Sequence, residues 1–330
     1  QFFQKRSKSW RGFPPDGFVM AFSWFCIVFS KVGSFALEQT CLLHMAPPDS
    51  MTRVNTLKIA VYTENIGSYE EVRMEGIPSV PSGMDAFYFA DPQTLDKHED
   101  AFALWRKNGW TTIEYRDMQQ GTKQVSGQRL TAKKLKFDPP EWMTQGEWNW
   151  LVHFDAEEYL YLEKLPSFIQ KRSNASLIMQ NWCHMSPPCC RQGGFACFQA
   201  EVEMLRGPER HRIVNSTQEY FQWVSDITKM GKNSTLSLPH YFETSIFMRN
   251  LKSTYSGEVK KAFYEVFEYN RKVPRDQPFV PVLLEKHGLN AEIITVFMSE
   301  LERDIGWKPG IRRAISNLLS TDASRHGPLG

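Results

Sequence analysis

The 330-residue sequence lacks an excess of charge of either sign, because 39 Lys and Arg residues face 37 Asp and Glu residues. The formal net charge is +2, and charges of both signs are interspersed along the chain. Binding to nucleic acid or to an acidic membrane depends on clustered positive charge, which this pattern does not provide. A small molecule or a glycan is therefore the expected substrate, and nucleic acid is not an expected partner.

A glycine-rich phosphate loop is also missing. Such loops hold the phosphates of a nucleotide with backbone N–H groups at the start of a helix. Without one, a phosphotransferase or nucleotidyltransferase is a weaker interpretation of the chain. No internal repeat is visible either, and the length is typical of one large globular domain.

Cysteine is sparse, and its spacing does not match a familiar zinc site. Four of the six cysteines follow the pattern C-x5-C-C-x6-C between Cys183 and Cys197. Two local disulfides would stabilise this segment in a secreted protein, whereas buried thiols are expected in the cytosol. Both alternatives remain open, and a metal site is a third.

The longest uncharged apolar run, 18–30, is shorter than the ~20 residues that a membrane-spanning helix needs. It follows four basic residues and precedes Lys31, an order that resembles a signal sequence or a short membrane anchor. We therefore expect a lumenal or single-pass type II protein of the secretory pathway, in the Golgi. Translation from Met51 would instead leave a cytoplasmic protein. Three sequons agree weakly with secretion and glycosylation: Asn174, Asn215 and Asn233.

Apolar strand patterns alternate with helical patterns from residue 57 onward. Strands are expected at 58–63, 85–91, 110–115, up to Asp155, 176–182 and 241–249, and helices at 94–108, 128–137, 165–171, 257–269 and 277–287. This order predicts a Rossmann-like α/β domain with a mixed, mostly parallel sheet flanked by helices. We expect a signal or anchor with a linker at 1–56, the domain at 57–300, and a C-terminal helix with a loose tail at 301–330.

An apolar run at 148–154 ends in three carboxylates, Asp155, Glu157 and Glu158. A buried strand would bring them to its carboxyl end, where open α/β sheets bind ligands. The i, i+2 spacing of Asp155 and Glu157 lets one turn present two hard oxygen ligands to Mn²⁺ or Mg²⁺. A solvated acidic turn is the plainer alternative, and the strand context favours the metal site.

The same segment resembles the D-x-D-E signature of family-2-like glycosyltransferases with the GT-A fold. In this chain the motif reads WLVHFDAEEY at 150–159, and an apolar strand ending in Trp182 follows it. The resemblance implies a GT-A glycosyltransferase that uses a nucleotide-diphosphate sugar as donor and a divalent metal. Glu157 replaces the usual Asp. This difference supports the alternative of a non-catalytic carbohydrate-binding protein on a decayed transferase domain.

Three further segments resemble a hexosyltransferase-like family associated with plant mucilage and pectin synthesis, once known only as a domain of unknown function. They are VYTENIGSY at 61–69, the glutamate-to-arginine strand at 243–249, and RDQPF at 275–279. The resemblance covers roughly residues 57 to 290. It implies transfer of a sugar to a hydroxyl of a glycan or glycoconjugate.

The resemblance assigns donor-binding roles to residues at strand ends and on one helix. Tyr62 and Thr63 would lie near the base or ribose, and Asp91 would help to hold the nucleotide. Arg129 and Lys133 are four residues apart, so a helix would present both to a diphosphate. A solvated basic face is the alternative for that helix.

Catalytic and further metal-binding roles fall on residues late in the chain. Asp276 is a candidate base or acceptor-binding residue, although it would also cap the helix that follows. Glu243 is a candidate acceptor-side carboxylate or the partner of Arg249 in an ion pair. His240 and His287 are candidates for a third metal ligand, and a lone histidine is more often structural.

Overall fold

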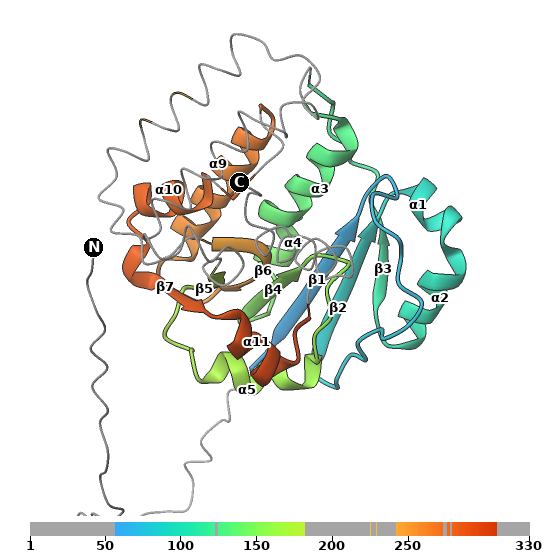
Figure 1. The fold of residues 1–330 in the computed structure, drawn as a ribbon, viewed down its shortest axis with the longest axis horizontal. Coiled ribbons are helices and arrows are strands. Elements are labelled where there is room, and N and C mark those ends of the chain that lie inside the picture. The colour runs from blue at the N-terminus through green and yellow to red at the C-terminus, as the bar shows by residue number, and fades with distance from the viewer. Residues whose placement is uncertain are drawn as a thin grey trace, which may run out of the picture. The chain divides into compact units, whose positions relative to one another are not determined.

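The computed structural model describes residues 57–122, 125–181, 242–272, 276–277 and 279–308, with positions 225 and 229. Its centre is a seven-stranded sheet with the order β3-β2-β1-β4-β6-β5-β7 (Figure 1). The strands are β1 Ile59–Asn65, β2 Met84–Ala90, β3 Thr111–Glu114, β4 Trp150–Phe154, β5 Leu177–Asn181, β6 Phe242–Asn250 and β7 Ile293–Val296.

Within this sheet β6 alone runs against its neighbours, pairing antiparallel with β4 and β5. All other pairs are parallel. The central strands read as continuous apolar runs because both of their faces are covered, and every residue of β4 is buried. The predicted α/β domain with a mixed, mostly parallel sheet flanked by helices is confirmed.

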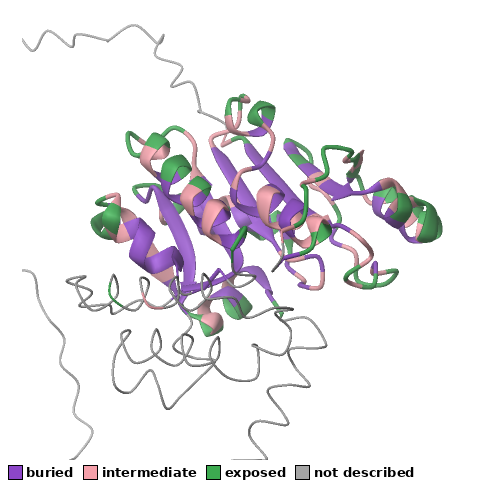
Figure 2. Ribbon diagram, turned by 90° about the horizontal axis from the view of Figure 1, so that it is seen from above, coloured by how far each residue is buried: buried purple, intermediate pink, exposed green. Residues whose placement is uncertain are grey.

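Helices pack on both faces of the sheet. They are α1 Pro92–Lys97, α2 Glu99–Lys107, α3 Gly127–Phe137, α4 Glu141–Thr144, α5 Leu165–Gln170, α9 Ser256–Asn270, α10 Phe279–Lys286 and α11 Met298–Ile305, with 3₁₀ turns at Leu162–Lys164 and Asn290–Glu292. Seen from above, the buried strands lie between partly exposed helices (Figure 2). In β1, Ile59 and Val61 face one apolar cluster, whereas Ala60 and Tyr62 face another. This alternation is the two-residue period of a strand covered on both sides.

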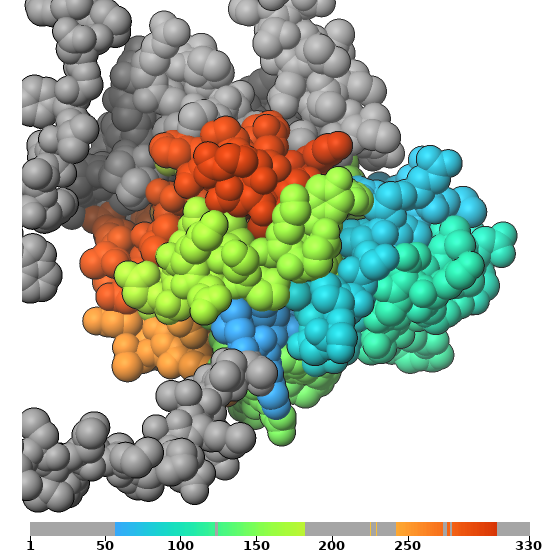
Figure 3. All heavy atoms as spheres, turned by 90° about the horizontal axis from the view of Figure 1, so that it is seen from below, coloured from blue at the N-terminus to red at the C-terminus, as the bar shows by residue number. Residues whose placement is uncertain are grey.

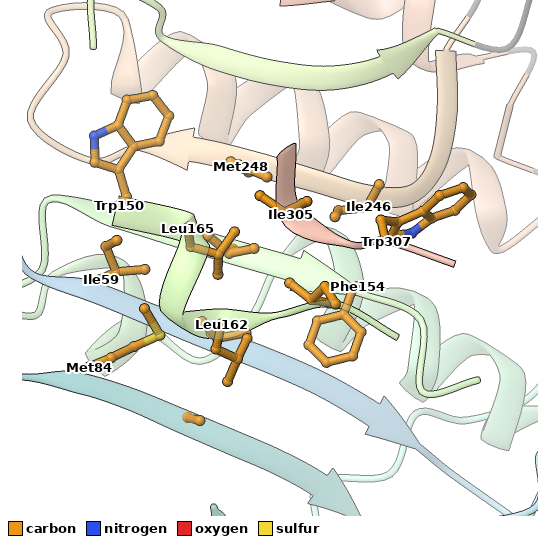
Figure 4. Packing of buried hydrophobic residues seen from close by; sticks show 14 of the residues in the cluster. Ile59, Met84, Trp150, Phe154, Leu162, Leu165, Ile246, Met248, Ile305 and Trp307 are labelled. Carbon is orange, nitrogen blue, oxygen red and sulfur yellow. The ribbon is translucent and has the colours of Figure 1, made fainter. Parts of the chain in front are cut away.

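The larger cluster joins the sheet to α2, α5 and α11. Phe154 of β4, Ile246 of β6 and Trp307 after α11 all belong to it (Figure 4). The orange-red C-terminal residues lie directly against the yellow-green segment that contains α5 (Figure 3). The predicted boundary at residue 300 falls inside α11, whose Leu301 and Ile305 are buried. Residues 301–308 therefore pack as part of the domain.

The helical region after β2 differs in detail from the sequence prediction. Asp91, not Thr94, caps its first helix, because the Asp91 carboxylate accepts from the Thr94 backbone N–H at 3.2 Å. Pro92 then occupies the first helical position, where its missing N–H costs nothing. The pattern also divides at His98 into α1 and α2.

Several sequence predictions lie outside the described residues. They concern 1–56, the cysteine cluster, the sequons at Asn215 and Asn233, and His240. In the part of the chain that the structure describes, no helix has both the length and the apolar character required to cross a bilayer.

Candidate functional site

A cavity of about 530 Å³ opens at the carboxyl ends of β1 and β4. The chain runs from β1 to β2 on one side and returns as β4 on the other, so the strand order reverses between β1 and β4. Open α/β sheets bind ligands at such a reversal. The walls come from the loop after β1, helix α3, the turn after β4, and residues Asp276 and Gln277.

Charged side chains of both signs line this cavity. They are the five carboxylates Glu64, Glu70, Asp155, Glu157 and Asp276, and the three cations Arg129, Lys133 and Lys136. Five of the ten assigned residues that the structure describes therefore meet here: Arg129, Lys133, Asp155, Glu157 and Asp276. Glu64, Lys136 and Gln277 belong to the same wall and were not assigned a role.

Lys136 links two of the acids. Its Nζ lies 2.8 Å from Oδ1 of Asp155 and 3.9 Å from Oδ2 of Asp276, and the residue is only 4% exposed. Burial disfavours the charged ammonium, but attraction to Asp155, Asp276 and Glu64 outweighs it and raises the pKa of Lys136. Lys136 is therefore a fixed positive charge at the centre of the cavity wall.

Asp276 is held by a lysine and a hydroxyl. Its Oδ2 accepts from Lys133 Nζ and from Thr244 Oγ1, each at 2.9 Å. Burial would raise the pKa of Asp276, but Lys133 and Lys136 prevail and lower it well below its usual value. A carboxylate held so firmly in its ionised form is a poor proton acceptor, so this environment argues against the general-base role. Its backbone carbonyl accepts from the Phe279 and Val280 N–H groups at the start of α10.

Glu64 and His153 form a buried pair beside Asp155. His153 Nε2 lies 2.9 Å from Glu64 Oε2, and burial raises the pKa of Glu64 and lowers that of His153. Ligand atoms of Glu64, His153 and Asp155 all lie within 4.8 Å of one another, a spacing that suits a cation. The pair was missed in the sequence because only the register of β1 with β4, which sets Tyr62 opposite His153, brings these side chains together.

The acidic turn after β4 divides its carboxylates between two environments. Asp155 and Glu157 line the cavity, whereas Glu158 is fully buried and accepts from Trp307 Nε1 at 2.7 Å. Arg73 fixes the turn by donating to the Glu157 backbone carbonyl. Glu158 is therefore a structural residue, whereas the other two carboxylates are part of the cavity wall.

Tyr62 and Thr63 do not line the cavity, which corrects their assignment as base or ribose contacts. Both are fully buried within β1. The Tyr62 hydroxyl donates to the Lys136 backbone carbonyl at 2.7 Å. The sequence placed them at the end of the first strand, but β1 continues to Asn65, so the exposed strand end comes later.

Asp91 and Glu243 also act through the backbone. Asp91 caps α1 and accepts from the Gly67 N–H, which shapes the loop after β1. Gly67 has a φ of +75°, and a Cβ atom there would lie 2.5 Å from Cδ of Gln128, so the loop needs glycine. Glu243 is 1% exposed and accepts from the Thr244 and Ser245 N–H groups, so its assignment as a catalytic group is corrected to a support for β6.

His287 lies away from the cavity and is not a metal ligand in this arrangement. Its ring nitrogens lie 3.3 Å from Glu258 and 3.2 Å from Glu265, both on α9. His287 directly follows α10, which ends at Lys286, and its ring lies against the neighbouring helix α9.

Replacing His287 with Ala should leave divalent-ion binding unchanged, because its ring nitrogens lie against glutamates of α9. Stability should fall only slightly, because ion pairs with partly exposed carboxylates contribute little. Calorimetric titration of the variant with Mn²⁺ tests this. Weaker binding than in the wild type would return His287 to the metal site.

Comparison with known proteins gives structural similarity only. No known family and no curated protein matches the sequence. Mouse xyloside xylosyltransferase 1 is similar over 73% of this chain and 85% of its own, with 11% identity and a TM-score of 0.41. The glycosyltransferase GlyE of Streptococcus pneumoniae is similar over 73% of this chain, with 8% identity and a TM-score of 0.37, but only 45% of its own length is spanned. The mannosyltransferase Ktr4p of S. cerevisiae is similar over 77% of this chain and 70% of its own, with 13% identity and a TM-score of 0.37.

Proposed function

We propose that this chain is a glycosyltransferase, in the hexosyltransferase class, that moves a sugar from a nucleotide-diphosphate sugar to a hydroxyl of a glycan or glycoconjugate. The carrying observation is the cavity at the reversal of strand order, where Asp155 and Glu157 face Arg129, Lys133 and Lys136. A donor of this kind combines a diphosphate, which needs cations, with a polar sugar. Three of the four segments that resemble glycosyltransferases contribute residues to these walls, and the strand at 243–249 does not.

The balance of charge in the cavity supports a requirement for Mn²⁺ or Mg²⁺. Even without Glu64, whose pKa is raised by burial, its carboxylates outnumber its cations by four to three, so a diphosphate alone would gain no net attraction. Asp155 and Glu157 offer the oxygen ligands that these ions prefer. When bound, such an ion neutralises the charge that develops on the leaving nucleotide diphosphate.

The remaining roles follow from the positions of the side chains. Lys133 and Lys136 lie three residues apart on α3, and both reach Asp276, at 2.9 and 3.9 Å. Their ammonium groups would attract the diphosphate. Arg129, one turn earlier on the helix, would extend this cationic strip toward the nucleotide. Asp276 would hold Lys133 in place and contribute a hydrogen-bond acceptor for the sugar.

Calorimetric titration with a panel of nucleotide-diphosphate sugars, each with and without Mn²⁺, tests this function against the non-catalytic alternative. We expect binding of at least one donor that strengthens with the ion, followed by slow hydrolysis of that donor. Glycan binding without affinity for any nucleotide sugar would favour the carbohydrate-binding protein. Binding of neither class would contradict sugar transfer altogether.

A further inference from the structure

Two side chains of the sheet hold the last turn of α3, and we call Tyr62 of β1 and Arg249 of β6 the α3 clamp. Arg249 donates to the backbone carbonyls of Lys136 at 2.7 Å and Phe137 at 3.1 Å. Tyr62 donates to the same Lys136 carbonyl at 2.7 Å and accepts from Arg249 at 3.0 Å. Carbonyls at the end of a helix have no partner within it, so the clamp satisfies groups that would otherwise be buried without one.

The guanidinium of the clamp is buried. Arg249 is 4% exposed, and burial lowers the pKa of its guanidinium. Its guanidinium carbon lies 5.1 Å from the Phe247 ring centroid and 4.5 Å from that of Phe263, so the charge rests on aromatic faces. Buried charges are often no more stabilising than apolar residues of similar volume. A residue that fixes one geometry is the better explanation of this charge.

The geometry it fixes is that of the cavity cations. Lys136 carries both the carbonyl held by the clamp and the ammonium group that reaches Asp155. Lys133, one turn earlier, reaches Asp276. Helix α3 also packs against β1 and α9, as Figure 1 shows, but the clamp contains the bonds that join its last turn to the sheet through side chains. A small shift or rotation of that turn would move both ammonium groups.

We propose that Tyr62 and Arg249 are positioning residues, which set the height and rotation of α3 so that Lys133 and Lys136 meet the diphosphate of the donor. The proposal rests on the function proposed above, because it takes the cavity as the donor site. It gives Tyr62 an indirect role, in which it holds a residue that would contact the ligand. It also gives the antiparallel strand β6 a part in donor binding, although Arg249 does not line the cavity.

The test is Tyr62→Phe, which removes one hydroxyl and keeps the ring. Tyr88→Phe is its matched control, because Tyr88 is an equally buried tyrosine that packs on Phe102 and Trp105 on the opposite face of the sheet. UDP and GDP with Mn²⁺ serve as probes in calorimetry. We expect Tyr62→Phe to weaken binding by about tenfold, the equivalent of one lost hydrogen bond. Tyr88→Phe should bind as the wild type does, even if it unfolds at a similarly lowered temperature.

Arg249→Lys provides a second measurement, because a lysine keeps the charge but cannot bond both carbonyls and the Tyr62 hydroxyl as a fork does. We expect it to weaken binding at least as much as Tyr62→Phe and to speed hydrogen exchange in the last turn of α3. If the wild type binds and both Tyr62→Phe and Tyr88→Phe bind with the wild-type affinity, the clamp is overturned while the proposed function stays intact. Failure of the wild type to bind any nucleoside diphosphate would instead overturn the proposed function.

Discussion

We expect replacement of Asp155 with Asn to remove the proposed divalent-dependent sugar transfer while the domain stays folded. The variant loses the charge that would bind the ion, and we expect a fall in activity of about a hundredfold or more. Folding should persist because the amide oxygen of Asn can still accept from Lys136, whose Nζ lies 2.8 Å from Oδ1 of the native Asp155. The loss of stability should stay near ~1–2 kcal/mol.

Donor hydrolysis over a range of Mn²⁺ concentrations, together with thermal unfolding, measures both parts of this prediction. Asp85→Asn is the matched control, because Asp85 lies at the opposite end of the sheet near the start of β2 and accepts from Trp148 Nε1. Its activity should equal that of the wild type. Full activity in Asp155→Asn would contradict the assignment of the acidic turn as the metal site.

Lys136→Met should be the most damaging single change in the cavity wall. It leaves Asp155 and Asp276 close together without the ammonium that both of them face. Removal of one partner from a buried ion pair typically costs about 3–5 kcal/mol. Asp155 loses its lysine partner, whereas Asp276 keeps Lys133 at 2.9 Å. The same change takes away a cation that would bind the diphosphate, so donor affinity should fall with stability.

Denaturant unfolding and donor titration test the two effects separately. The control is Lys134→Met on the same helix, where the lysine pairs with Asp138 four residues later and lies outside the cavity. This surface-type pair should contribute no more than about 1 kcal/mol. Equal stability and equal donor affinity in the two variants would show that Lys136 is an ordinary solvated lysine.

Much of the fold was predictable because its determinants are local. The alternation of apolar runs with amphipathic stretches indicated the strands and helices, and Asp155 and Glu157 were recognisable by their place after a buried strand. The helix over Gly127–Phe137 was expected at nearly the observed bounds, and with it Arg129 and Lys133. These residues reached the cavity because the ends of parallel strands meet at one edge of a sheet.

The errors in the predicted site concern residues whose environment depends on distant parts of the chain. Tyr62 lies in the middle of β1, where its hydroxyl bonds to the backbone of α3, and Asp91 follows β2 as expected but caps a helix. His287 follows a helix that lies against α9, so no local pattern could separate it from a metal ligand. In the sequence, Lys136 looks like any lysine on an exposed helical face. It reaches Asp155 only because α3 docks on the sheet.

The sequence by itself determined the α/β class, the acidic turn after β4 and the basic helix before it, because periodicity and composition act over a few neighbouring residues. Only the tertiary structure decided that β6 runs antiparallel beside β4, that Glu64 and His153 lie next to Asp155, and that Arg249 reaches the end of α3. Strand register and helix docking are set by the packing of the whole core, so contacts such as that between Tyr62 and Arg249, which lie 187 positions apart, emerge only when the chain has folded.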